Sequence, residues 1–163
     1  MARRKLDFRA HQKVVLPNGK IIHISYIHHP GAVIVAPLLN SNTVVLLRQF
    51  RPALGQYIYE LPAGTIDPAE KPLSCVQREL LEETGYCAKK FKKLGEIYPV
   101  PGYSTEVIHM FKAEGLIPGE AQPEDYEVID LKSVSKVQIQ KMFKQGKMMD
   151  AKSICTFAHL GWL

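Results

Sequence analysis

The chain of 163 residues has few cysteines and lacks a long run of apolar residues. Its three cysteines, Cys75, Cys87 and Cys155, form no Cys-x-x-Cys pair and cannot all be paired, which argues against a disulfide framework and a zinc site. No segment approaches the roughly 20 consecutive apolar residues of a membrane-spanning helix. The basic start MARRKLDFRAHQK also lacks the apolar run of a secretory signal, so we expect a cytoplasmic protein, with export by another route left open.

Negative charge is the scarcer sign in this sequence. The 16 Asp and Glu residues are outnumbered by 21 Lys and Arg residues, which leaves a net charge of +5. This excess favours an anionic partner such as a phosphorylated small molecule or a nucleic acid. The densest basic run, AKKFKKLG at residues 88–95, predicts a solvated loop and strand edge. Because no RNA-binding pattern of glycines and aromatics accompanies this run, nucleic acid is not the expected partner.

The apolar residues indicate one soluble domain with an appended β segment. Hydrophobic residues make up 46% of the chain, enough for a sizeable core. Two β-rich runs flank Asn18-Gly19 and predict a hairpin over residues 13–27. The apolar runs at 32–39 and 43–50 predict buried strands of a main sheet. We therefore expect an N-terminal antiparallel β-hairpin segment at 1–30 and an α/β domain with a mixed sheet at 31–163.

The remaining elements follow from local patterns and from capping residues. Further strands are predicted at 56–61, 94–100, 107–116 and 127–134, and helices at 72–84 and 135–145. Asp150 is the expected cap of a last helix. Helices placed between strands can cover both faces of one sheet, which predicts an α/β/α sandwich.

The helix predicted at 72–84 carries an unusual charge pattern. At about 100° per residue, one side of this helix gathers four residues that should face the core. These are Leu73, Val76, Leu80 and Thr84. Another side gathers Glu79, Glu82 and Glu83 within about 100° of each other. Like charges at this spacing repel by a few tenths of a kcal/mol per pair, so the cluster is either a solvated acidic face or a ligand set for a hard divalent cation.

The spacing of the surrounding residues favours the second interpretation. Gly64, Glu70 and Arg78 precede the three glutamates in the string GTIDPAEKPLSCVQRELLEETGY. This string resembles the Nudix box, GX5EX7REUXEEXGU, in which U is a bulky apolar residue. All fixed positions match, and only the last U departs, with Tyr86 in place of an aliphatic residue. The resemblance implies the Nudix α/β/α sandwich and hydrolysis of a nucleoside diphosphate linked to another group.

The resemblance also implies a metal site on this helix. Glu79 and Glu83 would be catalytic and would bind Mg²⁺ or Mn²⁺ directly, with Glu82 sharing a further ion. The carbonyl of Ala63, just before the first Gly of the box, would complete the coordination. Two or more ions are implied. Such cations neutralise a diphosphate and position a water for in-line attack.

Residues around the metal site are assigned in the same way. The resemblance pairs Glu70 with Arg78 in an ion pair that orients Glu83. YELPAG before the box and Pro101 after it resemble the ADP-ribose pyrophosphatase branch of the family. In that branch an arginine matched by Arg51 reaches the substrate, and the planar fork of Arg suits phosphate.

The general base is the least determined of the implied roles. In this branch it comes from an acidic loop before the last strand, here GEAQPEDYE. Glu124 is the first choice and Glu120 the second. Glu106, at the end of PGYSTE, resembles a loop glutamate that approaches the substrate or metal from opposite the helix, and it is the third candidate.

Two further features bear on substrate and assembly. Asp150-Ala151-Lys152 resembles a D-x-K motif of nucleoside diphosphate sugar hydrolases, which makes Asp150 and Lys152 candidate substrate-binding residues; the alternative is a helix cap followed by a first-turn lysine. Both branches form homodimers in which the N-terminal β segment helps to build the partner's site. An aromatic residue such as Tyr26 or Phe8 could then stack on a base.

These resemblances favour a homodimeric, Mg²⁺-dependent enzyme that cleaves nucleoside diphosphate sugars to a nucleoside monophosphate and a sugar 1-phosphate. The alternative within the family is an ADP-ribose pyrophosphatase that yields AMP and ribose 5-phosphate. A non-catalytic Nudix-fold binding protein is disfavoured, because a pure binder would not need every carboxylate together with Arg78. The sequence leaves the preferred base and sugar open.

Overall fold

A computed structural model describes residues 7–121 and 128–163 of the chain, and these form nine strands and three helices. The strands are β1 (Asp7–Val15), β2 (Ile21–His28), β3 (Ala32–Asn40), β4 (Thr43–Arg51), β5 (Gln56–Glu60), β6 (Ala63–Thr65), β7 (Tyr86–Ile97), β8 (Ile108–Pro118) and β9 (Ile129–Ser135). The helices are α1 (Pro72–Thr84), α2 (Lys136–Lys144) and α3 (Ala151–His159). Within these residues no helix is both long and apolar enough to cross a bilayer.

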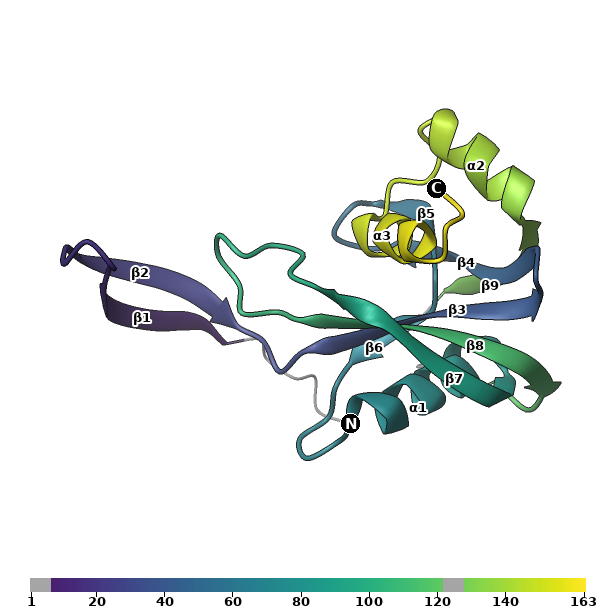
Figure 1. Ribbon diagram of the computed structural model, residues 1–163, viewed down its shortest axis with the longest axis horizontal. Coiled ribbons are helices and arrows are strands. Elements are labelled where there is room, and N and C mark those ends of the chain that lie inside the picture. Colours follow the sequence, from purple (N-terminus) through teal and green to yellow (C-terminus); the bar gives the residue numbers. More distant parts are fainter. Residues whose placement is uncertain (1–6, 122–127) are drawn as a thin grey trace.

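A mixed sheet forms the centre of the molecule. Strands β5, β4, β3, β8 and β7 lie side by side in that order, while β6 pairs with β3 and β9 pairs with β4. Strands β3 and β8 run parallel, and the other described pairs of this sheet are antiparallel. Helix α1 covers one face and α3 the other (Figure 1). The predicted α/β/α sandwich with a mixed sheet is confirmed.

Strand β3 is apolar and buried from Ala32 to Leu38 because both of its faces are covered there. Val33 and Val35 pack toward α1, in a cluster that includes Val76 and Leu80. Ile34 and Ala36 alternate with them and pack on the other face, in a cluster that includes Phe157 and Trp162. Successive side chains of a strand point to opposite faces, so a strand between two helices has no solvent side.

Helix α1 begins and ends as the sequence predicts. Pro72 occupies its first turn. Gly85 ends it in the left-handed conformation, with φ of 68° and its N–H donating to the Leu81 carbonyl at 2.8 Å. One prediction for its core face was wrong: Leu73 is 49% exposed, and Cys75 fills the buried position of the first turn. Side chains in the first turn lie at the end of the packed face, so a projection around the helix axis alone cannot assign them.

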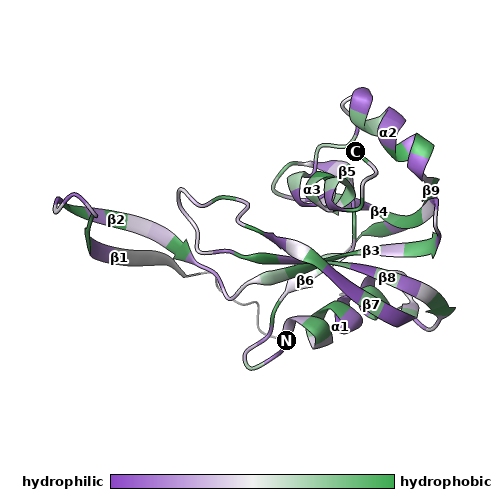
Figure 2. Cartoon of the chain, in the orientation of Figure 1, coloured by the Kyte–Doolittle hydropathy of each residue, from purple (hydrophilic) through white to green (hydrophobic). Residues whose placement is uncertain are grey.

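The basic run at residues 88–95 lies on an edge strand, as one part of its prediction has it, and the loop part of that prediction is wrong. Strand β7 pairs with β8 from Tyr86 to Ile97, with a register shift between Lys93 and Gly95. It is the edge of the described sheet, and four of its lysines are exposed, Lys89, Lys90, Lys92 and Lys93. Figure 2 shows the hydrophilic colour along this strand. Charged side chains on an edge strand oppose pairing with a further strand, which explains a basic run inside a β element.

The predicted N-terminal hairpin is present and projects from the body (Figure 1). Gly19 has φ of 79° in its turn, where Lys20 N–H donates to Asn18 Oδ1 at 3.1 Å. The base of the hairpin is attached through Ile27, which exchanges backbone hydrogen bonds of 2.8 and 3.0 Å with Tyr103 and Thr105.

Packing of α1 against the sheet predicts a clear stability difference between two leucines of this helix. Leu80 is fully buried and Leu73 is 49% exposed. Leu80→Ala should lower the free energy of unfolding by about 2–5 kcal/mol through lost burial and a residual cavity. Leu73→Ala should change it by less than about 0.5 kcal/mol. Urea unfolding followed by circular dichroism measures both, and equal losses would contradict this account of the helix face.

Candidate active site

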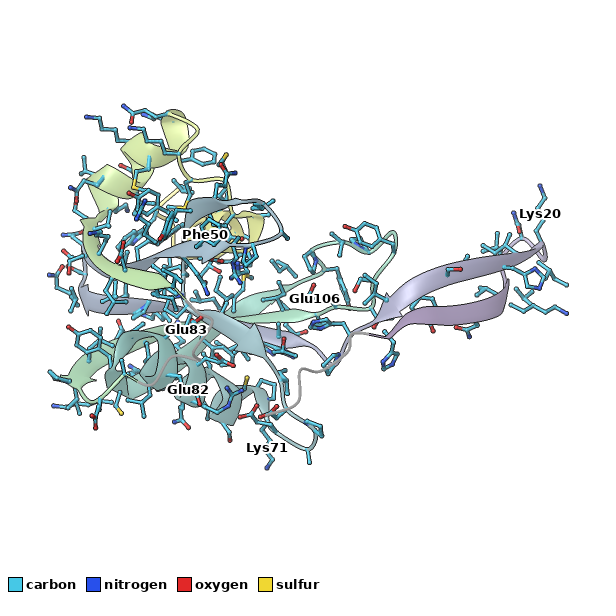
Figure 3. The ribbon with its side chains drawn as sticks, turned by 180° about the vertical axis from the view of Figure 1, so that it is seen from behind. Lys20, Phe50, Lys71, Glu82, Glu83 and Glu106 are labelled. Carbon is cyan, nitrogen blue, oxygen red and sulfur yellow. The ribbon has the colours of Figure 1, made fainter. Side chains whose placement is uncertain are left out.

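Two of the three glutamates of α1 reach β6, since Glu83 bonds to Ala63 and Glu79 lies against Gly64. Figure 3 labels Glu83 together with Glu82, which lies on the same helix. The exposure of the three glutamates falls as they approach the sheet. Glu82 has 38% of its side chain exposed, Glu79 has 13%, and Glu83 is buried at 6% as a whole residue. The apolar stripe of α1 determines this orientation, because Val76 and Leu80 press the adjoining side of the helix into the core.

Arg78 is the cation that holds this acidic cluster together. Its Nε and Nη2 donate to the two carboxylate oxygens of Glu70 at 3.0 and 3.1 Å. Its Nη1 donates to Glu79 at 2.7 Å and to Glu82 at 2.9 Å. Asp67 lies at 4.0 Å. The implied Glu70–Arg78 ion pair therefore forms, but its guanidinium contacts Glu79 and Glu82, whereas Glu83 is held elsewhere.

The pKa values of Arg78 and Cys75 are both raised at this cluster. The hydrogen bond to Glu70, followed by the charge of Glu79 and the bonds to Glu79 and Glu82, raises the pKa of Arg78 above its usual value, against the opposing effect of burial. Burial, together with the charges of Glu79 and Glu70, raises the pKa of the Cys75 thiol to about 12. Cys75 is therefore a neutral core side chain at physiological pH and is not a nucleophile.

Glu83 is held by the backbone that leads into the box. The N–H of Ala63 donates to its Oε2 at 2.9 Å. Ala63 is in turn fixed by pairing with Ile34 of β3, and the preceding Pro62 carbonyl accepts from Val35 N–H at 2.9 Å. The buried carboxylate of Glu83 thus contacts β6, the strand whose Ala63 carbonyl the resemblance implies as a metal ligand. The position of this contact depends on the pairing of β6 with β3.

Gly64 is required because Glu79 passes directly over it. A Cβ added to Gly64 would lie 2.0 Å from Cδ and Oε1 of Glu79, far inside any contact distance. The backbone conformation of Gly64 is ordinary, so the constraint is space and not a left-handed φ. The first glycine of the box therefore lets the carboxylate of Glu79 approach β6.

A second charged cluster lies at the end of β5. Glu60 is fully buried and accepts from Arg51 Nε at 2.7 Å, Arg51 Nη2 at 2.6 Å and Lys152 Nζ at 2.7 Å. Lys152 also donates to Asp150 at 2.8 Å. Two implied substrate-binding residues, Arg51 and Lys152, are thus brought together by Glu60. Sequence reasoning did not select Glu60, although it lies in the YELPAG segment that suggested the branch.

Carboxylates of both clusters affect the pKa of Arg51. Burial lowers its pKa, but the hydrogen bond to Glu60 and the charges of Glu60, Glu83 and Asp150 outweigh that effect, so the pKa of Arg51 is raised above its usual value. Asp150 also caps α3 as predicted, with Oδ2 accepting from Ser153 N–H at 3.1 Å.

Glu106 faces a histidine that sequence reasoning assigned no role. Its carboxylate lies 3.7 Å from His29 Nε2, beyond hydrogen-bond length. The N–H of Gly31 donates to His29 Nδ1 at 3.0 Å, which leaves the proton of the neutral ring on Nε2, toward Glu106. Only the pairing of the loop 98–107 with the end of β2 brings His29 and Glu106 together, so no sequence signal could have linked them.

The other candidate bases lie at the loop before β9. Glu120 is exposed, and its neighbours Gly119 and Ala121 approach Gly85 at the end of α1. Glu124 lies at 122–127, outside the described residues.

The donor set fits a hard divalent cation in its chemistry. Carboxylates of Glu79 and Glu83 face the Ala63–Gly64 strand, and Glu82 lies beside Glu79 on the same Arg78 guanidinium. Oxygen donors of this kind are preferred by Mg²⁺ and Mn²⁺. Within 7–121 and 128–163, however, no three acidic, histidine or cysteine side chains converge as a metal centre. Arg78 Nη1 occupies the position between Glu79 and Glu82, so ions would have to compete with this guanidinium for the carboxylates.

The close approach at Gly64 predicts a selective loss of metal affinity. Gly64→Ala should displace the flexible Glu79 carboxylate and leave the fold in place, so the thermal midpoint should change little while Mn²⁺ affinity falls by roughly 10-fold or more. Calorimetric titration with Mn²⁺ and thermal unfolding measure the two effects. Gly102→Ala is the control, since its added methyl meets no atom within 4 Å. Unchanged Mn²⁺ binding in Gly64→Ala would contradict a ligand role for Glu79.

Comparisons with known proteins agree with the box. The NUDIX domain model matches residues 28–155. An ADP-ribose pyrophosphatase of Bacillus subtilis (strain 168) is 35% identical over 151 residues, covering 91% of this chain and 82% of that protein. A GDP-mannose pyrophosphatase of Citrobacter koseri is 34% identical over 173 residues, covering 98% and 83%. A methanol dehydrogenase activator of Bacillus methanolicus is 34% identical over 149 residues, covering 90% and 80%.

A solved structure supports the fold independently. The crystal structure of an ADP compounds hydrolase superposes with a TM-score of 0.80 at 18% identity, covering 91% of this chain and 81% of that one. The family model covers most of the sequence, and the relatives align along most of their own lengths. The chain belongs to the Nudix family.

Proposed function

We propose that this protein is a divalent-cation-dependent hydrolase that cleaves the diphosphate bond of nucleoside diphosphate sugars, giving a nucleoside monophosphate and a sugar 1-phosphate. The observation that carries the proposal is the juxtaposition of an acidic turn of α1 with the cations Arg51 and Lys152. Both cations pair with Glu60, and Ala63, three residues further along the chain, donates to Glu83 of that turn. A diphosphate needs a cation-binding side and a phosphate-binding side, and these two clusters supply them.

The names of the relatives support this substrate class and leave its members open. One relative is a pyrophosphatase for ADP-ribose and another for GDP-mannose, at nearly equal identity. Both compounds are sugars joined to a nucleoside through a diphosphate. ADP-ribose cleavage to AMP and ribose 5-phosphate is therefore the second candidate. The third candidate is a binding protein without turnover. It is included because one relative is named for activating another protein, as a methanol dehydrogenase activator.

The roles in the reaction follow from the site. Glu79, Glu82, Glu83 and the Ala63 carbonyl would hold Mg²⁺ or Mn²⁺, which when bound neutralises the diphosphate and lowers the pKa of a water. Arg51 would donate to the phosphates through its guanidinium fork. The general base would come from the loop before β9, with Glu124 as first candidate and Glu120 or Glu106 as alternatives.

We further propose that the protein is a homodimer formed through β1 and β2. The hairpin exposes Ile22 and Ile24 on one face, and Val15 and Ile21 on the other. The proposed interface is the face of Ile22 and Ile24. A two-stranded hairpin is at best marginally stable alone in water, and a second copy would cover it. Tyr26, half-buried beside Gln12, is then the candidate for stacking on a base; the Phe8 side chain lies outside the described part.

A substrate panel separates the candidate activities. With Mg²⁺ and ADP-ribose, ADP-glucose, GDP-mannose or UDP-glucose, we expect comparable turnover of several sugars, measured as phosphatase-releasable phosphate. Turnover of ADP-ribose alone would favour the second candidate.

Glu83→Gln tests catalysis against binding. It should lower kcat by about 100-fold or more, since even the partners that orient a metal ligand are worth about 10–100-fold in activity. Glu96→Gln, at an exposed carboxylate of β7 paired with Lys93 and His109, is the matched control and should keep full activity. A wild-type protein with no metal-dependent turnover on the whole panel would overturn the proposed function.

A substitution on the hairpin tests the dimer. Ile22 and His23 are neighbours on β2 that point to opposite faces of the hairpin. Ile22→Lys should dissociate the dimer at micromolar concentration, because a buried unpaired charge is strongly disfavoured, and it should lower activity with it. His23→Lys serves as control. Sedimentation velocity measures both, and a monomeric wild-type protein would contradict the proposed assembly.

A further inference from the structure

A fully buried carboxylate joins three segments of the chain at the phosphate side of the candidate site. Glu60 ends β5, Arg51 ends β4, and Lys152 lies in the first turn of α3, 92 residues from Glu60. The carboxylate accepts both arms of the Arg51 fork, and the ammonium of Lys152 reaches the same oxygen, Oε2, that accepts from Arg51 Nη2. A buried ionised carboxylate is stable only with such complete pairing.

The two cations are less buried than the anion that holds them. The Glu60 side chain is 1% exposed, while Arg51 is 38% and Lys152 is 19% exposed. Two positive charges that bond to the same oxygen atom in a partly buried setting repel each other. Without Glu60, Arg51 and Lys152 would therefore separate toward solvent. With Glu60 present, both cations donate to its Oε2, and each keeps part of its side chain exposed to solvent.

The helix that carries Lys152 is fixed to the same strand end. The N–H of Leu61, the residue after Glu60, donates to Ser153 Oγ at 2.8 Å in a buried hydrogen bond. Ser153 N–H and Oγ both bond to Asp150 Oδ2. Asp150 Oδ1 accepts from Lys152 at 2.8 Å. The start of α3 is thus bound to the Leu61 backbone through Ser153 and to the Glu60 side chain through Lys152. These bonds keep Lys152 next to Arg51.

We propose that Glu60 is a positioning residue that holds Arg51 and Lys152 together as a two-cation cradle for the diphosphate of the substrate. This inference rests on the proposed function and adds the residue on which phosphate binding depends. Glu60 itself would not touch the substrate, because its carboxylate is buried behind the two cations. The role of the Asp150-x-Lys152 pair is then to present a lysine that Glu60 orients.

The exposed pair Arg48–Asp130 offers a matched comparison. Arg48 Nη1 donates to Asp130 at 3.0 Å across β4 and β9, with 37% and 53% of the two side chains exposed. This ion pair has the same chemistry as Arg51–Glu60, but both its partners are solvated. Loss of an exposed pair is worth little to stability, so Asp130→Asn controls for a general effect of removing a carboxylate near β4.

Glu60→Gln tests the cradle. It should raise KM for ADP-ribose and GDP-mannose by about 10-fold or more, the range for losing hydrogen bonds to charged groups, with a smaller change in kcat. Calorimetric titration should show weaker ADP binding and unchanged Mn²⁺ binding in the absence of nucleotide. Asp130→Asn should alter none of these. Glu60→Asp, which keeps the charge and shortens the side chain, should be intermediate and serves if Glu60→Gln does not fold.

A double-mutant comparison separates positioning from a structural role. If Glu60 acts through Arg51, Glu60→Gln should raise KM much less in an Arg51→Ala background than in the wild-type chain. Additive effects, or a lower thermal midpoint with unchanged KM and ADP affinity, would overturn the cradle. If the wild-type chain has no turnover but binds ADP in a Glu60-dependent way, the proposed function fails and the cradle stands. If the wild-type chain neither turns over a substrate nor binds ADP, the proposed function and the cradle both fail.

Discussion

Like-charge repulsion on one turn of α1 is the constraint on which the candidate site depends. Arg78 lies within 4.0 Å of four carboxylates, Asp67, Glu70, Glu79 and Glu82. A guanidinium spreads its charge over a planar fork and can serve several carboxylates at once. The helix can therefore keep its glutamates together near the sheet. The proposed cations would meet this acidic turn with its side chains already close to β6.

The cluster at the end of β5 has the reverse arrangement of charge, with one anion between two cations. On α1 one cation serves several anions, whereas at the end of β5 one buried anion, Glu60, serves two cations. The acidic cluster suits divalent ions, and the basic cluster suits phosphate oxygens. The segment from Glu60 to Ala63 connects them, since Glu60 bonds Arg51 and Ala63 N–H bonds Glu83. Such a polarity matches a substrate whose diphosphate lies between metal ions and fixed cations.

Much of the fold was predictable because its local signals agree with one another. The apolar runs of β3 and β4, the Asn18-Gly19 turn and the Pro72 and Gly85 boundaries of α1 each specify a local structure that the tertiary fold keeps. The errors arose where tertiary context decides. The basic run at 88–95 forms a strand because β8 pairs with it, and Leu73 is exposed because it lies in the first turn of the packed helix.

The sequence by itself determined the acidic turn and its chemistry, because the spacing of Gly64, Glu70, Arg78 and the glutamates is local and a helix converts it directly into a shared face. It also determined the family. Only the tertiary structure decided which groups meet across the site. Ala63 N–H reaches Glu83, Glu79 passes over Gly64, His29 faces Glu106, and Glu60 joins Arg51 to Lys152. These contacts join separate strands, loops and helices, and a linear pattern holds no information on distances that only sheet pairing and core packing create.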